Sequence, residues 1–432
     1  MLKTSQLIGR IQEGAYDDTF RGMYNADESG VAHQRERYVA AIRRFEELYG
    51  ADREVTLYSA PGRTEIGGNH TDHNNGIVMA AAVNLDIIAV VSQNGSKTVR
   101  VKSHGFRDAD VVDLTESAVN EREFGRSSAL IRGVAARIVQ LGGKAEGFDA
   151  YTTSDVLRGS GLSSSAAFEV VIGAIFNGEF NAFRFTPVEI AQISQYAENV
   201  YFGKPSGLMD QTASSVGSAI TIDFADPSSP IVEEVAFDLS QYGLSLCITD
   251  TKGSHADLTD DYAAIRSEME QVAGLFGKKV LREVDEDRFF SEIARVREAA
   301  GDRAVLRAIH FFAECHRAIA LRDAVKAGDI ERFKKLIIDG GHSSFEYNQN
   351  AYSIKHPKEQ GVAVGVALSQ HVLEGAGAWR LQGGGFAGTI QAFVPADRLE
   401  RYIATMESAF GKGSCYVLSV RNYGAIRVEE KL

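Results

Sequence analysis

This sequence has few cysteines, and its first residues do not read as a secretory signal. Only three of its 432 residues are cysteines, Cys247, Cys315 and Cys415, and no two of them form a CxxC pair. This spacing gives no metal-binding pattern and favours isolated, buried thiols in a reducing compartment. The first residues, MLKTSQLIGRIQEG, lack the apolar core of a signal peptide. We therefore expect a cytoplasmic protein.

Long apolar runs and excess positive charge are also lacking. The apolar stretch around residues 77–92 is broken by Asn84 and Asp86, which leaves it too short to span a bilayer. With 46 Lys and Arg against 58 Asp and Glu, the net charge is −12. Nucleic acids and anionic membranes favour basic surfaces, so neither is expected as a partner, and no obligate protein partner is evident. No Gly-Lys-Ser or Gly-Lys-Thr occurs, which excludes a Walker A loop.

The chain does have the composition and patterning of a mixed globular protein. Hydrophobic residues make up 44% and charged residues 24%, which is ordinary for a soluble fold. Helical periodicity dominates residues 1–52, and strands and helices alternate from there to about residue 217. Strand patterns, four charged helical stretches between about 257 and 342, and a final strand follow. Two α+β halves, 1–220 and 221–432, fit this pattern best, with 1–32 as a helical extension.

The most unusual stretch is PGRTEIGGNHTDHNNG, residues 61–76. It is expected to follow a strand and to precede two strand-like runs over residues 76–95. Four glycines alternate there with Arg63, Glu65, Asn69, His70, Asp72 and His73. A plain surface turn needs one or two such residues, whereas this density indicates a loop that wraps a polar ligand.

Two further glycine-rich segments and two carboxylates stand out. RGSGLSSSAA, residues 158–167, precedes a helical pattern. A helix N-terminus that follows a glycine loop can bind a phosphate group through its free N–H groups. A simple turn with serine caps would have a similar sequence. LQGGGFAGT, residues 381–389, could be a plain hairpin. Glu198 and Asp210 suggest metal ligation and proton abstraction, although either alone could be a surface carboxylate or a helix cap. The chain thus combines the 61–76 stretch, two further glycine-rich segments and the two carboxylates. Their occurrence together in one chain favours a phosphoryl-transfer site.

In these motifs the chain resembles the GHMP small-molecule kinases, and within them the galactokinases. The resemblance runs from about Phe45 to the C-terminus and rests on the 61–76 stretch, GSGLSSSAA, GKPSGLMDQ and LQGGGFAGTI. It implies an N-terminal domain like ribosomal protein S5 domain 2, a ferredoxin-like C-terminal domain and an active site in the cleft between them. It also implies transfer of the γ-phosphoryl of ATP to the anomeric hydroxyl of galactose, with Mg²⁺.

Residue roles follow from the same motif matches. Asp210 would be the catalytic base or would orient the hydroxyl, and Arg63 would stabilise charge beside it. Ser165 and Glu198 would hold Mg²⁺. The sugar contacts would be Asn69, His70, Asp72, Gly207 and Tyr262. The phosphate cradle would be Gly159, Ser160, Gly161, Leu162, Ser163, Ser164, Ser165 and Ala166.

The sequence departs from the resembled motif mainly at the sugar. The usual Gly-Glu-His-Thr-Asp-Tyr-Asn becomes GNHTDHN, with Asn69 in place of the glutamate that contacts the sugar O6. The usual Val-Asn-Leu-Ile after the arginine becomes TEIG, residues 64–67. A neutral residue at position 69 could accept a carboxylate at C6, and plant-type galacturonate kinases share this change. Galacturonate therefore remains an alternative substrate, and a non-catalytic sugar sensor is a further one.

Overall fold

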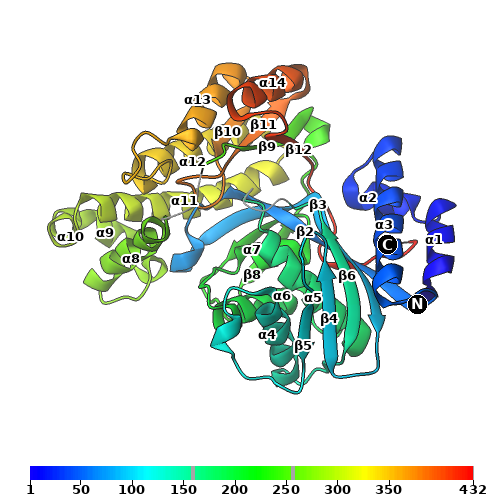
Figure 1. Cartoon of the computed structure of the whole chain (residues 1–432). Helices are drawn as coiled ribbons and strands as arrows, with labels where there is room; N and C mark the ends of the chain where they lie inside the picture. The colour runs from blue at the N-terminus through cyan, green and yellow to red at the C-terminus, as the bar shows by residue number, and fades with distance from the viewer. Residues whose placement is uncertain (157–160, 254–257, 432) are drawn as a thin grey trace.

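Two antiparallel-rich sheets organise the chain, which is described here by a computed structural model over residues 1–156, 161–253 and 258–431 (Figure 1). The larger sheet has the order β1-β2-β3-β6-β4-β5, with β13 paired to β2 and the β7–β8 hairpin paired to β3. Only β4 and β6 pair in parallel among these strands. The strands are β1 (Leu2–Lys3), β2 (Glu54–Gly67), β3 (Ile77–Gln93), β4 (Thr98–Ser103), β5 (Asp110–Asp113), β6 (Phe148–Ser154), β7 (Ala219–Asp223), β8 (Ile231–Val235) and β13 (Ile426–Arg427).

The strands β2 and β3 are longer than the sequence suggested. Residues 77–93 form one strand rather than two, and Pro61 to Gly67, expected in a loop, belong to β2. Two irregularities interrupt the β2–β3 pairing, between Pro61 and Arg63 and between Glu65 and Gly67. Bulges of this kind turn side chains toward a new direction and often lie beside active sites. The polar stretch is thus partly a bulged strand, which a loop-like composition conceals.

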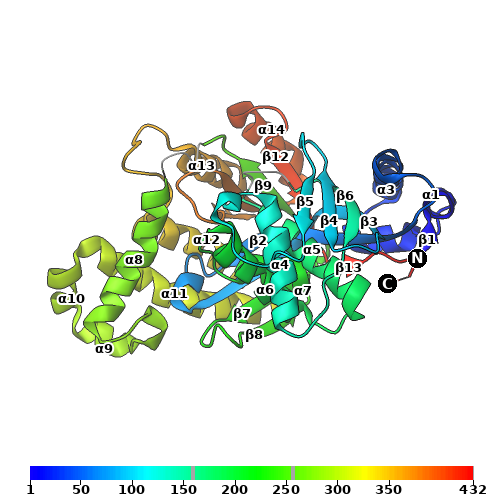
Figure 2. The ribbon, with the colours of Figure 1, turned by 60° about the horizontal axis from the view of Figure 1, so that its bottom comes forward.

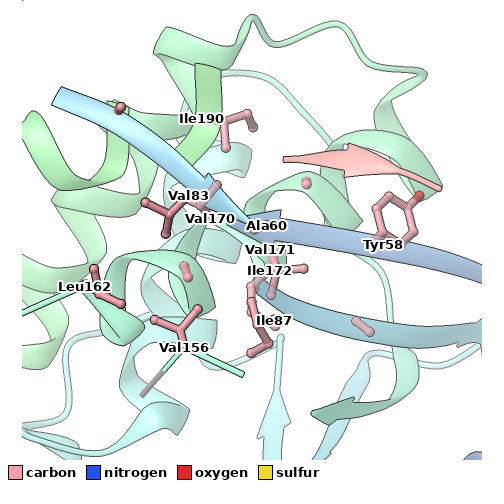
Figure 3. Close-up of a cluster of buried hydrophobic side chains, with 14 of the residues drawn as sticks. Tyr58, Ala60, Val83, Ile87, Val156, Leu162, Val170, Val171, Ile172 and Ile190 are labelled. Carbon is pink, nitrogen blue, oxygen red and sulfur yellow. The ribbon is translucent and has the colours of Figure 1, made fainter. Parts of the chain in front are cut away.

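Helices cover both faces of the large sheet. One face carries α4 (Ser127–Gln140), α5 (Ser164–Asn181), α6 (Pro187–Tyr196) and α7 (Met209–Val216), with a π-helical turn η3 (Ala197–Phe202) extending α6. The alternating side chains of β2 and β3 meet the apolar face of α5 in a common core, including Ala60, Val83, Val170 and Ile172 (Figure 3). Thr186 caps α6 and Pro187 opens it, and both residue types are favoured at these helix positions.

The N-terminal helices cover the opposite face. These helices, α1 (Thr4–Gln12), α2 (Asp17–Tyr24) and α3 (Glu28–Tyr49), bury Leu7, Phe20, Tyr38 and Phe45 against β2, β3 and β6 (Figure 2). Asp86, which interrupts the apolar run, lies buried in this layer and accepts hydrogen bonds from Arg37, Arg421, Tyr24 and Ser59. The extension is therefore part of the packed structure.

The second sheet, of order β10-β11-β9-β12, is antiparallel throughout. Its strands are β9 (Leu244–Asp250), β10 (Ala378–Leu381), β11 (Thr389–Pro395) and β12 (Cys415–Leu418). The helices of this half are α8 (Thr259–Leu275), α9 (Glu286–Ser291), α10 (Ile293–Ala300), α11 (Asp302–Lys326), α12 (Ile330–Ser343), α13 (Gly361–Leu373) and α14 (Leu399–Phe410). Helices α12, α13 and α14 pack on this sheet, while α8 to α10 form an arm to one side (Figures 1 and 2).

The expected boundary near residue 220 falls inside β7, which still pairs with the first sheet together with β8. Strand pairing favours a division after Val235, with the segment after β12 returning to β2 through β13. Among the described residues, no helix has the length and apolar character needed to cross a membrane.

Candidate active site

An arginine–carboxylate pair lies where α7 meets β2. The guanidinium of Arg63 donates through Nε to Oδ1 of Asp210 and through Nη2 to Oδ2, both at 2.7 Å. Ser163 Oγ donates to the same Oδ2 at 2.5 Å. This two-point arginine contact fixes the direction of the carboxylate as well as its charge. The sequence predicted that Asp210 and Arg63 would meet, and the structure brings them together.

The environment of Asp210 keeps it ionised. Burial by itself would raise the pKa of this carboxyl, but the charge and hydrogen bonds of Arg63, followed by Ser163, hold the pKa below its usual range. A carboxylate with a lowered pKa is a weak base at neutral pH. It is suited to accepting a hydrogen bond from a hydroxyl and receiving its proton only late in a reaction.

The phosphate-loop motif runs directly against this pair. Arg63 donates its backbone N–H to Leu162 O at 3.1 Å and its Nη1 to Gly161 O. Gly62 permits this approach, because a Cβ there would lie 2.9 Å from Leu162 O. Ser163 has a left-handed backbone, φ 58°, immediately before α5 begins. The loop therefore ends at a helix N-terminus whose first N–H groups lack helical partners.

The residues predicted to form the phosphate cradle differ in their burial and in what they contact. Ser164, Ser165 and Ala166 form the first turn of α5, where both serines are half-buried and Ala166 is buried. Ser163 faces Asp210 rather than open solvent. Gly159 and Ser160 lie outside the described residues.

The buried carboxylates Glu198 and Glu169 form a second acidic group in this domain. Glu198 is 2% exposed, and its oxygens accept from Lys204 Nζ at 3.0 Å and Gln211 Nε2 at 2.8 Å. Gln211 also donates to buried Glu169 at 3.3 Å, and burial followed by the nearby Glu198 raises the pKa of Glu169 well above its usual range. Ser165 lies one helical turn before Glu169 on α5, on the same helix face. Gln211 thus links Glu198 to Glu169, on the helix that also carries Ser165.

The residues assigned to the sugar contact one another or the Gly-Gly-Gly loop of residues 383–385. Asp72 lies so close to Gly207 that a Cβ on Gly207 would be 1.9 Å from Asp72 Oδ2. His70 has a left-handed backbone, φ 60°, and its Nε2 donates to Gly384 O at 2.9 Å. Tyr262 donates its hydroxyl to Gly385 O at 2.9 Å. Asp72 and Gly207 therefore contact each other, while His70 and Tyr262 contact the Gly-Gly-Gly loop of residues 383–385.

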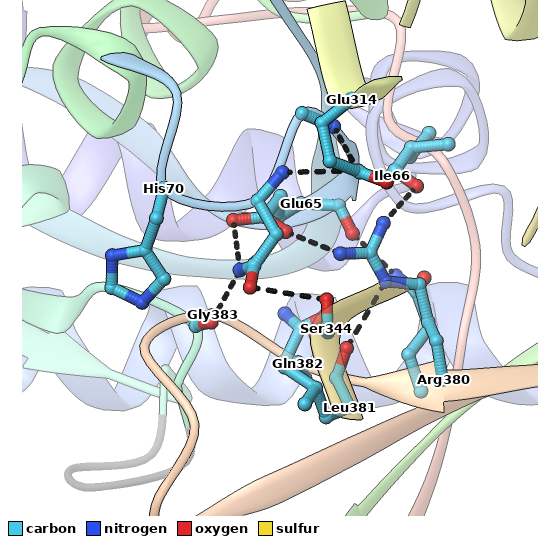
Figure 4. A network of polar contacts seen from close by, with 12 residues as sticks. Glu65, Ile66, His70, Glu314, Ser344, Arg380, Leu381, Gln382 and Gly383 are labelled. Atoms are coloured by element: carbon cyan, nitrogen blue, oxygen red, sulfur yellow. Dashed lines mark hydrogen bonds and ion pairs between the residues drawn. The ribbon is translucent and has the colours of Figure 1, made fainter. Parts of the chain in front are cut away.

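Asn69, which the motif match assigns to the sugar, has several protein partners. Its side chain is fully buried and donates hydrogen bonds to Glu65 and to the carbonyl of Gly383, within a polar cluster (Figure 4). Sequence reasoning also overlooked Lys204 and Gln211, the two partners of Glu198. The charge in GKPSG was the only signal for Lys204, and nothing in the sequence marked Gln211.

Two buried histidines near the motif are held neutral. Burial and the neighbouring His73 ring lower the pKa of His70 to about 4, and burial lowers the pKa of His310 to about 3. His310 donates from Nε2 to Asn69 O at 2.8 Å, while its Nδ1 faces Ser343 Oγ at the same distance. At neutral pH these rings act as hydrogen-bonding groups rather than as charges.

Comparison with known proteins identifies the family of two segments and the relatives of the fold. Residues 129–218 match the N-terminal domain of the GHMP kinases, and residues 43–93 match the galactokinase galactose-binding signature. The fold resembles a Lactococcus lactis galactokinase solved with galactose (TM-score 0.75, 22% identity, 89% of this chain and 98% of that one) and a mevalonate kinase (TM-score 0.59, 13% identity, 85% and 99%). Fold and site together define a kinase of the GHMP type. The predicted two-domain α+β fold is confirmed.

Relatives found by sequence show to which family within the GHMP kinases the chain belongs. A galactokinase from Streptomyces coelicolor is 33% identical over 372 residues, covering 85% of this chain and 91% of the relative. One from Actinobacillus pleuropneumoniae is 32% identical, covering 83% and 90%. The chain belongs to the galactokinase family, and ATP is its expected co-substrate.

Proposed function

We propose that this protein transfers the γ-phosphoryl group of ATP to the anomeric hydroxyl of galactose, giving galactose 1-phosphate and ADP. The main support for this proposal is the position of the Asp210 carboxylate. Arg63 and Ser163 fix it beside the phosphate loop, and three residues earlier in the chain Gly207 packs against Asp72 of the sugar motif. Phosphoryl transfer depends mostly on such positioning and on charge stabilisation.

In the proposed reaction Asp210 accepts a hydrogen bond from the sugar hydroxyl and orients it toward the phosphoryl group. The proton passes to the carboxylate as the new O–P bond forms, because a base with a lowered pKa does not remove it beforehand. Arg63 keeps Asp210 ionised and stabilises the charge that develops on the transferred group. Asp72 and His70 would bind sugar hydroxyls and so select the stereochemistry.

The residues at Glu198 fit a magnesium ion. Among the described residues no group of three or more His, Cys, Asp or Glu side chains forms a metal cage. Mg²⁺ needs only one or two protein oxygens when phosphates and water supply the rest, and Ser165 and Glu198 would provide them. Bound there, the ion would neutralise phosphate charge. Lys204, now on Glu198, would exchange that contact for the phosphates.

Replacing Glu198 tests this assignment. We expect Glu198→Gln to weaken Mn²⁺ binding in the presence of ADP by about tenfold or more, because the amide keeps the shape but removes the charge. Electron paramagnetic resonance of free Mn²⁺ measures this binding without turnover. Glu234→Gln, a change on strand β8, is the control. Unchanged Mn²⁺ affinity in Glu198→Gln would remove Glu198 from the metal site.

The substrate is tested by ADP release with Mg²⁺, ATP and a panel of galactose, galacturonate, N-acetylgalactosamine, arabinose and glucose. We expect galactose to have the highest kcat/KM. One argument for galacturonate was a neutral Asn69 facing C6, and the burial of that side chain among protein partners speaks against such a contact. A higher kcat/KM for galacturonate would overturn the choice of sugar. Absence of turnover with every sugar would favour a non-catalytic sensor.

A further inference from the structure

A buried polar cluster joins the sugar motif to the second half of the chain. We call it the Asn69 cluster: Glu65, Asn69, Ser344, Asn350 and Arg380. Its members come from β2 and the following turn, from the π-helical turn Ser344–Asn348 and the segment just after it, and from β10. Figure 4 shows Glu65, Ser344 and Arg380 grouped on one side, whereas the His70 ring points to the other side.

The Asn69 side chain has no hydrogen-bonding capacity left for a ligand. Its Nδ2 donates to Gly383 O at 2.7 Å and to both Glu65 oxygens at 3.0 and 3.2 Å. Its Oδ1 accepts from Asn350 Nδ2 at 2.9 Å and Ser344 Oγ at 3.3 Å. An amide offers two N–H groups and two lone pairs, and all four are used. The residue is also fully buried.

The cluster balances one carboxylate against one guanidinium. Arg380 is 1% exposed, and it donates to Glu65 Oε1 at 2.7 Å and to Ile66 O at 2.6 Å. Glu65 is 3% exposed, so both charges are largely shielded from water. A second carboxylate here would be repelled, and loss of the first would leave Arg380 buried without a partner.

Through Asn69 the cluster sets the position of the sugar motif. Asn69 donates to Gly383 O and His70 to Gly384 O, so two consecutive motif residues hold two consecutive carbonyls of the glycine loop. From the other side, Glu314 on α11 accepts from the backbone N–H groups of Gly68 and Asn69 at 3.1 and 3.3 Å. The loop that carries Asp72 is thereby fixed between the two halves.

We propose that Asn69 is a positioning residue rather than a sugar contact, and that Glu65 and Asn69 act as one carboxylate–amide pair which aligns the sugar motif with the glycine loop. Both residues depart from the family pattern, and in opposite senses: the amide expected at position 65 is a carboxylate, and the carboxylate expected at position 69 is an amide. A paired exchange keeps the single negative charge that Arg380 requires. Selectivity at C6 of the sugar is therefore not set by direct contact with residue 69.

The pair is tested by isosteric charge changes. Asn69→Asp and Glu65→Gln should each lower the melting temperature by several degrees and kcat/KM by about tenfold or more, because each unbalances the buried charge. The double variant restores one carboxylate and should recover most of both losses. Gln241→Glu, which places a carboxylate beside Asp238 on the surface, is the matched control and should change little. Additive losses in the double variant would overturn the pairing.

The sugar contact is tested with galactose and 6-deoxygalactose. If residue 69 only positions the loop, Asn69→Ala lowers kcat/KM for both sugars by the same factor. A loss confined to galactose would show direct contact with O6 and overturn the proposal. This kinetic test rests on the proposed sugar-kinase function, whereas the melting temperatures need no substrate. Restored stability without turnover in any variant, wild type included, would confirm the pair and reject the function.

Discussion

Asp210→Asn should lower kcat for galactose by about a thousandfold while leaving the fold intact. The amide still accepts a hydrogen bond from Ser163, but it offers no negative charge to Arg63 and cannot receive the hydroxyl proton. The loss should appear mainly in kcat, because the proton is transferred only in the transition state. ADP release at saturating ATP and galactose measures it, and thermal unfolding verifies that the variant is folded.

Asp226→Asn is the matched control, since this exposed aspartate also accepts from a neighbouring serine but lies outside the site. In the wild type, Arg63 holds the pKa of Asp210 below its usual range, so Asp210 loses its charge only in acid. The rate should therefore show no loss from this group between about pH 8 and pH 5. A near-normal rate in Asp210→Asn would refute the assigned role.

Asp86→Ala should lower the free energy of unfolding by about 3–5 kcal/mol. The carboxylate is fully buried and accepts from Arg37 at 2.7 Å, Arg421 at 2.9 Å and Tyr24 at 2.7 Å. Its removal takes the charge partner from buried Arg421 and leaves Arg37 with Asp155 alone, at the junction of the N-terminal helices, β3 and the C-terminal segment. Urea unfolding followed by circular dichroism measures the change. Asp323→Ala, which removes a surface partner of Arg322, should have little effect.

The same network predicts a pH dependence. Burial raises the pKa of Asp86, but Arg37 and Arg421 outweigh it and lower the pKa below the usual range. A group with a lowered folded-state pKa stabilises the protein above its unfolded pKa, near 4, and this contribution is lost as the pH falls through the folded-state value. Wild type should lose stability below about pH 4 more steeply than Asp86→Ala. Equal acid sensitivity would show that Asp86 does not contribute.

Part of the site could be predicted from local patterns. The glycine and serine residues of 158–167 before an apolar helical repeat, and Asp210 in GKPSGLMDQ, have chemistry that their immediate neighbours define. The pairing of Arg63 with Asp210 followed from motif matching, although 147 residues separate them. Lys204 and Gln211 were missed because a lysine and a glutamine suit most surface positions, and only packing places them on Glu198.

The sequence by itself determined the α+β class and most helices, and it supplied the candidate reacting groups, because periodicity and side-chain chemistry are local properties. Only the tertiary structure decided where polar side chains point. Asn69 and His70 are adjacent in sequence and both contact the glycine loop, yet the Asn69 side chain lies in the buried cluster while the His70 ring points away from it. Likewise Asp86 looked like an interruption of an apolar strand, and its partners come from residues 24, 37, 59 and 421. Buried charges require such distant partners, and folding alone brings them together.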